Sequence, residues 1–183
     1  MGTIKTTNIE PIADNGTVTL GSSGDTFTIP SGVTVAGAMA NTPAFVAYKT
    51  SDQSISNTTT TKVTFTGEQL DTNSTYDTGT SRFTPGVAGY YFIGGFWRYD
   101  TGTNFGGAQW TLFKNGTSIQ ARLGYNDSSN GYNYNYITYA DADDYFELFA
   151  YQNSGGSVNI NGAGGYQSNQ SQGYFYAYRI IGI

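Results

Sequence analysis

A group of acidic residues at positions 141–147 is the densest set of side chains that could do chemistry. Asp141, Asp143 and Asp144 lie within four positions, and Glu147 follows shortly after. Carboxylate oxygens are ligands for Ca²⁺, and a pair of carboxylates is also the apparatus of glycoside hydrolysis. The spacing matches no EF-hand loop, and acidic residues in a turn before a strand are usually solvated. Asp141, Asp143 and Asp144 are therefore candidate calcium ligands, and the alternative is that they are solvated residues of a turn with no ligand.

Other kinds of chemistry are excluded by composition. The chain contains neither histidine nor cysteine, which rules out a Ser-His-Asp triad, a cysteine nucleophile and zinc sites built from His and Cys. With 8 Lys plus Arg and a net charge of −5, no basic stripe exists to hold nucleic acid. No apolar run approaches the roughly 18 residues of a membrane span. We expect no enzyme, no cofactor, and neither nucleic acid nor membrane as a partner.

The elements that position these groups are predicted to be strands. Only 11% of the residues are charged and 16% are aromatic. Thr, Val, Ile, Tyr and Phe dominate short runs punctuated by Gly, Asn, Asp and Ser, which is typical of strands and turns. Asn115-Gly116 predicts a hairpin. Strands are expected at residues 44–48, 62–65, 90–99, 108–114, 117–123, 132–139, 145–151, 158–160 and 173–181, a pattern that favours an all-β sandwich or jelly roll.

Two parts of the chain differ in composition. Residues 1–42 hold short apolar stretches rich in Thr and separated by Gly and Ser, and such strands are too short to bury much surface within one chain. This segment is either disordered or ordered against other chains, and the alternation of Thr with apolar residues at 26–29 favours the second interpretation. We therefore expect an extended, β-rich arm at residues 1–42 and a head at residues 43–183.

A spaced series of aromatic residues runs through the head and ends in a Gly-x-Tyr strand. Its members are Phe65, Asp71, Tyr76, Phe83, Gly89 and Tyr91. The series resembles the signature of the C1q-like domain in the C1q and tumour-necrosis-factor jelly-roll superfamily. Phe45 stands in a segment that looks like the family's first strand. One departure is that Ile93 and Gly95 occupy positions where the family usually has aromatic residues, which a bulge or a local repacking would accommodate.

The resemblance implies a homotrimer with aromatic side chains around a three-fold axis. Tyr174, Tyr176 and Tyr178 share one face of a strand, and Phe175 lies on the other. A strand that is apolar on both faces is covered on both, so a second sheet would cover one face and the trimer axis the other. An ordinary monomeric sandwich is the alternative. The residues expected in core or trimer packing are Phe45, Phe65, Tyr76, Phe83, Gly89, Tyr91, Tyr174, Phe175 and Tyr176.

Two further sets of residues are candidates for recognition. Tyr132, Tyr134 and Tyr136 share a strand face, with asparagines on the other face. They would form either a glycan platform or an aromatic layer between subunits. Binding residues concentrate on loops, so the expected recognition residues are Tyr99, Asn104, Phe105, Tyr125 and Asn126.

The arm has a resemblance of its own. Residues 19–32 are rich in Thr, Ser and Gly. They look like repeats common in bacteriophage virion proteins, especially tail fibres and other surface appendages. With the head, this predicts a non-enzymatic protein on the particle surface. Residues 1–42 would contact other virion proteins, and a trimeric knob would attach to a host-surface glycan or protein. Capsid decoration and a separate carbohydrate-binding module are the alternatives.

Overall fold

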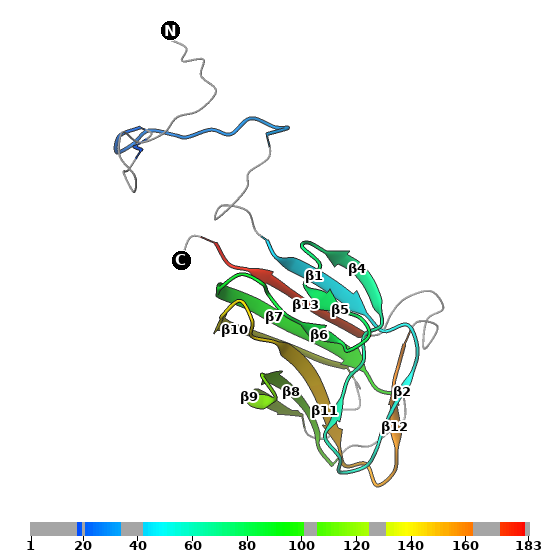
Figure 1. Ribbon diagram of the computed structural model, residues 1–183. Helices are drawn as coiled ribbons and strands as arrows, with labels where there is room; N and C mark the ends of the chain where they lie inside the picture. The colour runs from blue at the N-terminus through cyan, green and yellow to red at the C-terminus, as the bar shows by residue number, and fades with distance from the viewer. Residues whose placement is uncertain are drawn as a thin grey trace. The chain divides into compact units, whose positions relative to one another are not determined.

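The computed structural model describes residues 18–19, 21–33, 42–100, 106–124, 131–162 and 173–181. The chain divides into two compact units, Met1–Val35 and Ala36–Ile183, so the division falls ahead of the boundary that composition suggests at residue 42. All assigned strands lie in the head (Figure 1). Within the described ranges, no helix is long and apolar enough to cross a membrane.

The described part of the head is built from short antiparallel strands. Most strands correspond to runs of alternating apolar and polar residues, and these runs end at Gly, Asn, Asp or Ser. The strands are β1 (Ala44–Tyr48), β2 (Gln53–Ile55), β3 (Thr61–Lys62), β4 (Gly67–Asp71), β5 (Tyr76–Asp77), β6 (Arg82–Phe83), β7 (Gly89–Arg98), β8 (Ala108–Lys114), β9 (Thr117–Gly124), β10 (Gly131–Ala140), β11 (Phe146–Gln152), β12 (Val158–Ile160) and β13 (Gly173–Arg179).

Two sheets form a sandwich. The first sheet has the order β10-β7-β13-β1-β4, and the second has the order β5-β6-β11-β8-β9, with β3 paired to β11. β2 and β12 form a separate two-stranded ribbon. Strands distant in sequence are neighbours, because β13 at the end of the chain lies between β1 and β7 (Figure 1). The expected all-β sandwich is confirmed.

Aromatic side chains from both sheets fill the core. The Phe45 ring lies 4.6 Å from Tyr76, 4.7 Å from Phe83 and 4.9 Å from Phe175, measured between ring centroids. These separations suit stacked and edge-to-face aromatic pairs. Six of the residues expected in core or trimer packing lie in this core, each at most 6% exposed: Phe45, Phe65, Tyr76, Phe83, Tyr91 and Phe175.

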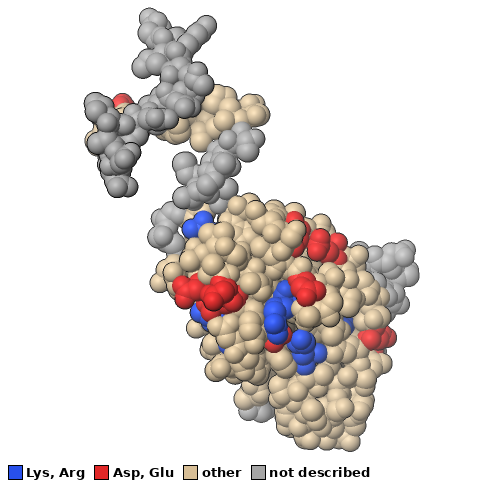
Figure 2. Space-filling view, viewed as in Figure 1, with Lys and Arg blue, Asp and Glu red and all other residues tan. Residues whose placement is uncertain are grey.

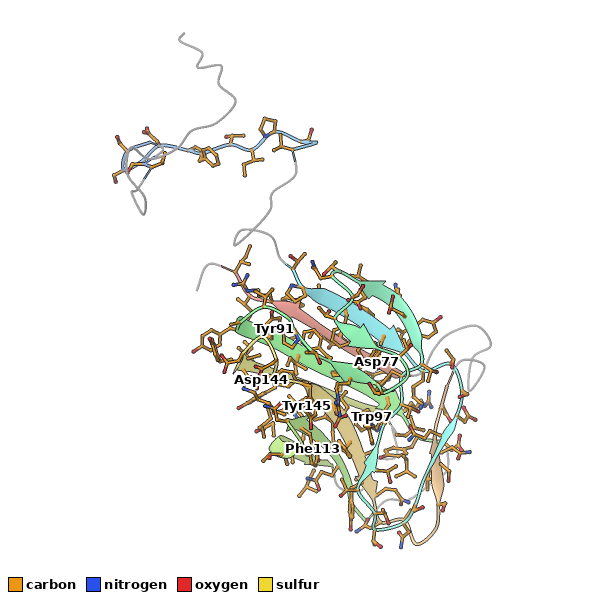
Figure 3. All side chains as sticks on the ribbon, viewed as in Figure 1. Asp77, Tyr91, Trp97, Phe113, Asp144 and Tyr145 are labelled. Atoms are coloured by element: carbon orange, nitrogen blue, oxygen red, sulfur yellow. The ribbon has the colours of Figure 1, made fainter. Side chains whose placement is uncertain are left out.

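The departure from the aromatic pattern at β7 is accommodated by repacking. β7 pairs with β10 and β13 in continuous register, without a bulge. A Cβ added at Gly95 would lie 2.4 Å from Leu148 Cδ1 and 3.3 Å from Trp110 Nε1. Side chains of the second sheet therefore occupy the space where an aromatic residue of β7 would sit. Tyr91 and Trp97, toward opposite ends of β7 (Figure 3), are both buried in the core.

The turn between β8 and β9 is the predicted Asn-Gly hairpin. Asn115 has a φ of 52° and Gly116 a φ of 75°. Positive φ at both central residues is the requirement of the type I′ turn, whose twist matches the flanking strands. The hairpin prediction is confirmed, and the turn sets Lys114 opposite Thr117.

The described part of the arm is extended between two turns. Asp25 N–H donates to Ser22 O at 3.0 Å, and Val33 N–H donates to Pro30 O at 3.3 Å. Between these turns, Phe27 is 64% exposed and Ile29 is 37% exposed. The two side chains stand two positions apart, so in an extended chain they point to the same side.

Candidate interaction surface

Large apolar side chains stay exposed mainly on the outer face of the first sheet. The exposed large hydrophobic residues in the described part of the head are Leu70, Val87, Tyr90, Leu123, Ile137, Tyr139, Tyr178 and Ile181. Five of these eight, namely Leu70, Tyr90, Ile137, Tyr139 and Tyr178, lie on this face. Single exposed apolar residues are ordinary, but a contiguous patch marks an interaction site.

Strand register proves that these residues share one face. Directly opposed residues in an antiparallel pair project to the same side. Tyr139 is opposite Tyr90, Ile137 is opposite Phe92, and Phe92 is opposite Tyr178. We define the aromatic face as the outward residues Leu70, Tyr90, Phe92, Phe96, Ile137, Tyr139, Tyr174, Tyr176 and Tyr178.

The rings of the aromatic face contact one another across strands. Tyr90 and Tyr139 pack edge to face with centroids 5.5 Å apart. Phe92 stacks with Tyr178 at 5.2 Å and with Tyr176 at 6.4 Å. Cross-strand aromatic pairs of this kind stabilise a sheet by a few tenths to about 1 kcal/mol each. The rings are thus held in place before any partner arrives.

A glycine in β7 shapes the centre of this face. A Cβ at Gly94 would lie 2.2 Å from Asn135 Oδ1 and 2.6 Å from the Tyr176 ring. The Tyr176 hydroxyl donates a hydrogen bond to Asn135 Oδ1 at 2.6 Å. Burial raises the pKa of Tyr176, so this hydroxyl stays protonated at neutral pH. The glycine lets Tyr176 lie flat against the sheet.

Charge is nearly absent from the aromatic face. Arg98, at the end of β7, is the one charged residue at the described outward positions of β7, β10 and β13. Depletion of charge and enrichment of aromatic residues are the compositional marks of an interface core.

Some of the residues predicted for core or trimer packing lie in the core, and others lie on the aromatic face. Gly89 begins β7 and is half-buried, with Arg179 Nε 2.8 Å from the position of an added Cβ. Tyr174 and Tyr176 are half-buried on the aromatic face, whereas Phe175 is in the core. Packing between subunits remains a prediction for the two tyrosines.

The tyrosines of β10 do not form the predicted platform. Tyr134 and Tyr136 are half-buried and pack against the core within the subunit. Tyr134 lies opposite Gly95, and its ring is 4.7 Å from Trp110. An outward row of rings, whether as a glycan platform or as an intersubunit layer, is therefore wrong for these two residues, because their face of β10 turns inward. The Tyr132 side chain lies outside the described residues.

Tyr99, one of the residues predicted for recognition, is not in an exposed loop. Tyr99 is 1% exposed and forms a bridge with Ile160. Its hydroxyl donates to Tyr151 O at 3.5 Å. Tyr99 is a core residue, because the residue directly after β7 still pairs with Ile160 of β12 instead of entering an exposed loop. The other four residues, Asn104, Phe105, Tyr125 and Asn126, lie outside the described residues.

The acidic group is a structural turn in this geometry. Asp144 is 7% exposed, and its carboxylate accepts from Lys114 Nζ and Asn115 Nδ2, both at 2.6 Å, and from Asp141 N–H at 2.7 Å. Burial opposes ionisation of Asp144, but these hydrogen bonds together hold its pKa below the usual value. Asp141 and Asp143 are exposed. No three potential metal ligands gather in the described part of the chain, so the calcium hypothesis has no geometric support.

Glu147 belongs to a separate ion-pair network. Its Oε1 lies 3.2 Å from Lys62 Nζ and 3.0 Å from Arg82 Nη2. Arg82 also covers the Tyr145 ring at 3.8 Å from the centroid. Small mixed groups of positive and negative side chains are visible on the head (Figure 2). Asp144 has a pKa held below its usual value, whereas a glycosidase general acid needs a raised one.

Lys49 is a buried cation in the described part of the head. It is 1% exposed, and its Nζ donates to Thr64 O at 3.0 Å and Gln53 Oε1 at 3.2 Å. Desolvation lowers the pKa of Lys49 from 10.5 to about 8, although Asp52 acts in the opposite direction. Burial raises the pKa of Tyr91 from 10.0 to about 12.

These shifts predict a stability maximum near pH 10. Between about pH 8 and pH 10 the unfolded chain holds the Lys49 proton more tightly, so the free energy of unfolding rises with pH. Above pH 10 the unfolded chain loses the tyrosine proton that native Tyr91 retains, so stability falls. Urea unfolding from pH 7 to pH 11 measures both limbs. Lys49→Met should remove the rise, and a wild-type curve that falls steadily from pH 8 would contradict the assignment.

Comparisons with known structures address the fold. The globular domain of zebrafish complement 1qA matches with a TM-score of 0.52 and 15% identity, covering 76% of this chain and 98% of its own. Eiger TNF from S. frugiperda matches with a TM-score of 0.59 and 10% identity, covering 79% and 96%. Murine APRIL matches with a TM-score of 0.51 and 8% identity, covering 75% and 99%. The fold is a C1q/TNF-like jelly roll.

This jelly-roll assignment concerns architecture. No family model matches the sequence, and no curated protein matches it. Identities of 8–15% to the three structures show the fold alone. The fold predicted from the aromatic series is confirmed.

Proposed function

We propose that the protein is a non-enzymatic binding protein whose head assembles as a homotrimer through the aromatic face. The observation that carries this proposal is the gathering of exposed Tyr90, Ile137, Tyr139 and Tyr178 on one sheet face. Burying such a face against a second and third copy removes apolar surface from water at roughly 25 cal/mol per Å². The likeness of the fold to C1q and TNF structures favours three copies, because resemblance to this superfamily implies a homotrimer.

We further propose that the trimer belongs to the surface of a bacteriophage virion. Residues 1–42 attach it to other virion proteins, and the head faces the host surface to bind a glycan or protein receptor. Two features support this role: the phage-like repeat at residues 19–32, and the exposed Phe27 and Ile29 between two turns of the arm. An extended apolar segment of this kind gains cover by docking on a partner.

Gold-labelled antibody against the head, applied to intact particles, tests the virion role. The proposal expects label at the tail, and it expects particles that lack the protein to adsorb to host cells at least about tenfold more slowly. If the label lies over the capsid and adsorption is normal, the protein decorates the capsid and does not attach to a receptor. Complete absence of label from purified particles would overturn the virion role.

A further inference from the structure

A small pocket opens between the edges of the two sheets. β9 is the edge strand of the second sheet and β10 is the edge strand of the first. Between them lies a pocket of about 150 Å³, whose lining includes Trp110, Arg122, Asn133 and Tyr134. A cavity of about this volume admits one six-membered ring. The pocket is separate from the centre of the aromatic face.

One side of the pocket is a rigid aromatic wall. Trp110 is 1% exposed, and its ring centroid lies 4.7 Å from that of Tyr134 and 6.2 Å from that of Trp97. The Trp97 and Trp110 planes are within 15° of parallel. The negatively polarised face of an aromatic ring attracts C–H groups. A pyranose ring, whose faces carry axial C–H groups, fits such a wall.

The polar lining is rich in donors. Arg122 is exposed and has no ion-pair or hydrogen-bond partner within the described part of the chain. Gln120 Nε2 donates to the Tyr134 hydroxyl at 2.6 Å, which leaves the hydroxyl proton free to donate elsewhere. A ligand that satisfies this set must bring oxygen acceptors.

Charge narrows the ligand class further. The chain has a net charge of −5, so a cation without a partner in a pocket is a specific feature rather than part of a basic surface. The guanidinium fork of arginine matches a carboxylate with two parallel hydrogen bonds.

We propose that this pocket binds one acidic pyranose, a hexuronic acid unit of a surface polysaccharide. Arg122 pairs with the carboxylate, and the sugar ring lies against Tyr134, whose ring packs on the buried Trp110. This inference rests on the proposed role of the head in surface recognition, and it names the ligand class of that role.

The two tryptophans allow a direct test with the full chain. The sequence contains two Trp, so a ¹H–¹⁵N spectrum shows two indole signals, which Trp97→Phe assigns. Titration with glucuronate should move the Trp110 signal more than the Trp97 signal. Glucose, which lacks the carboxylate, and acetate, which lacks the ring, should each bind at least about tenfold more weakly than glucuronate, a difference of about 1.4 kcal/mol.

Variants separate the site from the assembly. Arg122→Gln should weaken glucuronate binding at least about tenfold without changing the mass of the particle in light scattering. Arg82→Gln removes the same charge at the Glu147 network and should leave binding unchanged. Equal affinity for glucose and glucuronate, or full binding by Arg122→Gln, would overturn the inference. If the protein is a trimer and glucuronate does not shift the Trp110 signal, the binding site proposed at this pocket is wrong and the proposed assembly is unaffected. If a monomer binds glucuronate, the binding site is supported and the proposed assembly is contradicted.

Discussion

Replacing Tyr90 and Tyr178 together by glutamate is expected to leave the head folded and convert it to a monomer. Both side chains are exposed in the single chain, at 46% and 40%, so the substitution removes little buried surface within it. In an assembled trimer the new carboxylates would be buried without partners, which costs several kcal/mol. We expect subunit dissociation to become at least about a hundredfold more favourable, or about 2.7 kcal/mol.

Size-exclusion chromatography with light scattering measures this effect. Leu123→Glu is the matched control, because Leu123 is 50% exposed on β9 of the second sheet. The control should keep the mass of the wild type, and circular dichroism should show the same β content for all three proteins. A double variant that retains the wild-type mass would show that the aromatic face is not the contact.

Phe45→Ala is expected to destabilise the head by about 3–5 kcal/mol. Phe45 is 1% exposed and its ring contacts Tyr76, Phe83 and Phe175, so truncation removes three aromatic contacts and leaves a cavity between the sheets. Urea unfolding at a fixed chain concentration measures the change, because assembly makes apparent stability depend on concentration. Phe27→Ala, at a position 64% exposed in the arm, should change the free energy of unfolding by less than about 0.5 kcal/mol. A loss below about 1 kcal/mol at Phe45 would contradict the core assignment.

Strands with a buried face could be predicted from the sequence, whereas the edge strand β4 and the shortest strands could not. Residues 44–48, 108–114 and 158–160 form strands with the predicted bounds, because apolar residues alternate there or run without interruption. β4, with the sequence GEQLD, was not predicted. It is an edge strand whose central three residues are exposed, so its Glu and Gln face water and resemble a loop. β5 and β6 have two residues each and are too short for any periodicity.

The candidate surface was predictable in part. The alternation of residues along 174–178 placed the tyrosines on the other face of the strand from Phe175. It therefore indicated that a partner covers this second apolar face. The same reasoning failed at β10, because alternation shows which residues share a face and not which face turns inward. Tyr134 faces Trp110, and Ile137 faces solvent, only because β10 pairs with β7 in one particular register. The pocket beside Arg122 has no signal in the sequence, since it arises where the edges of two sheets meet.

The mass of the wild-type chain at sedimentation equilibrium tests the central claim most directly. We expect a single species of three times 19.7 kDa at micromolar concentration, with dissociation only on strong dilution. A species of 19.7 kDa over the same range would contradict assembly through the aromatic face.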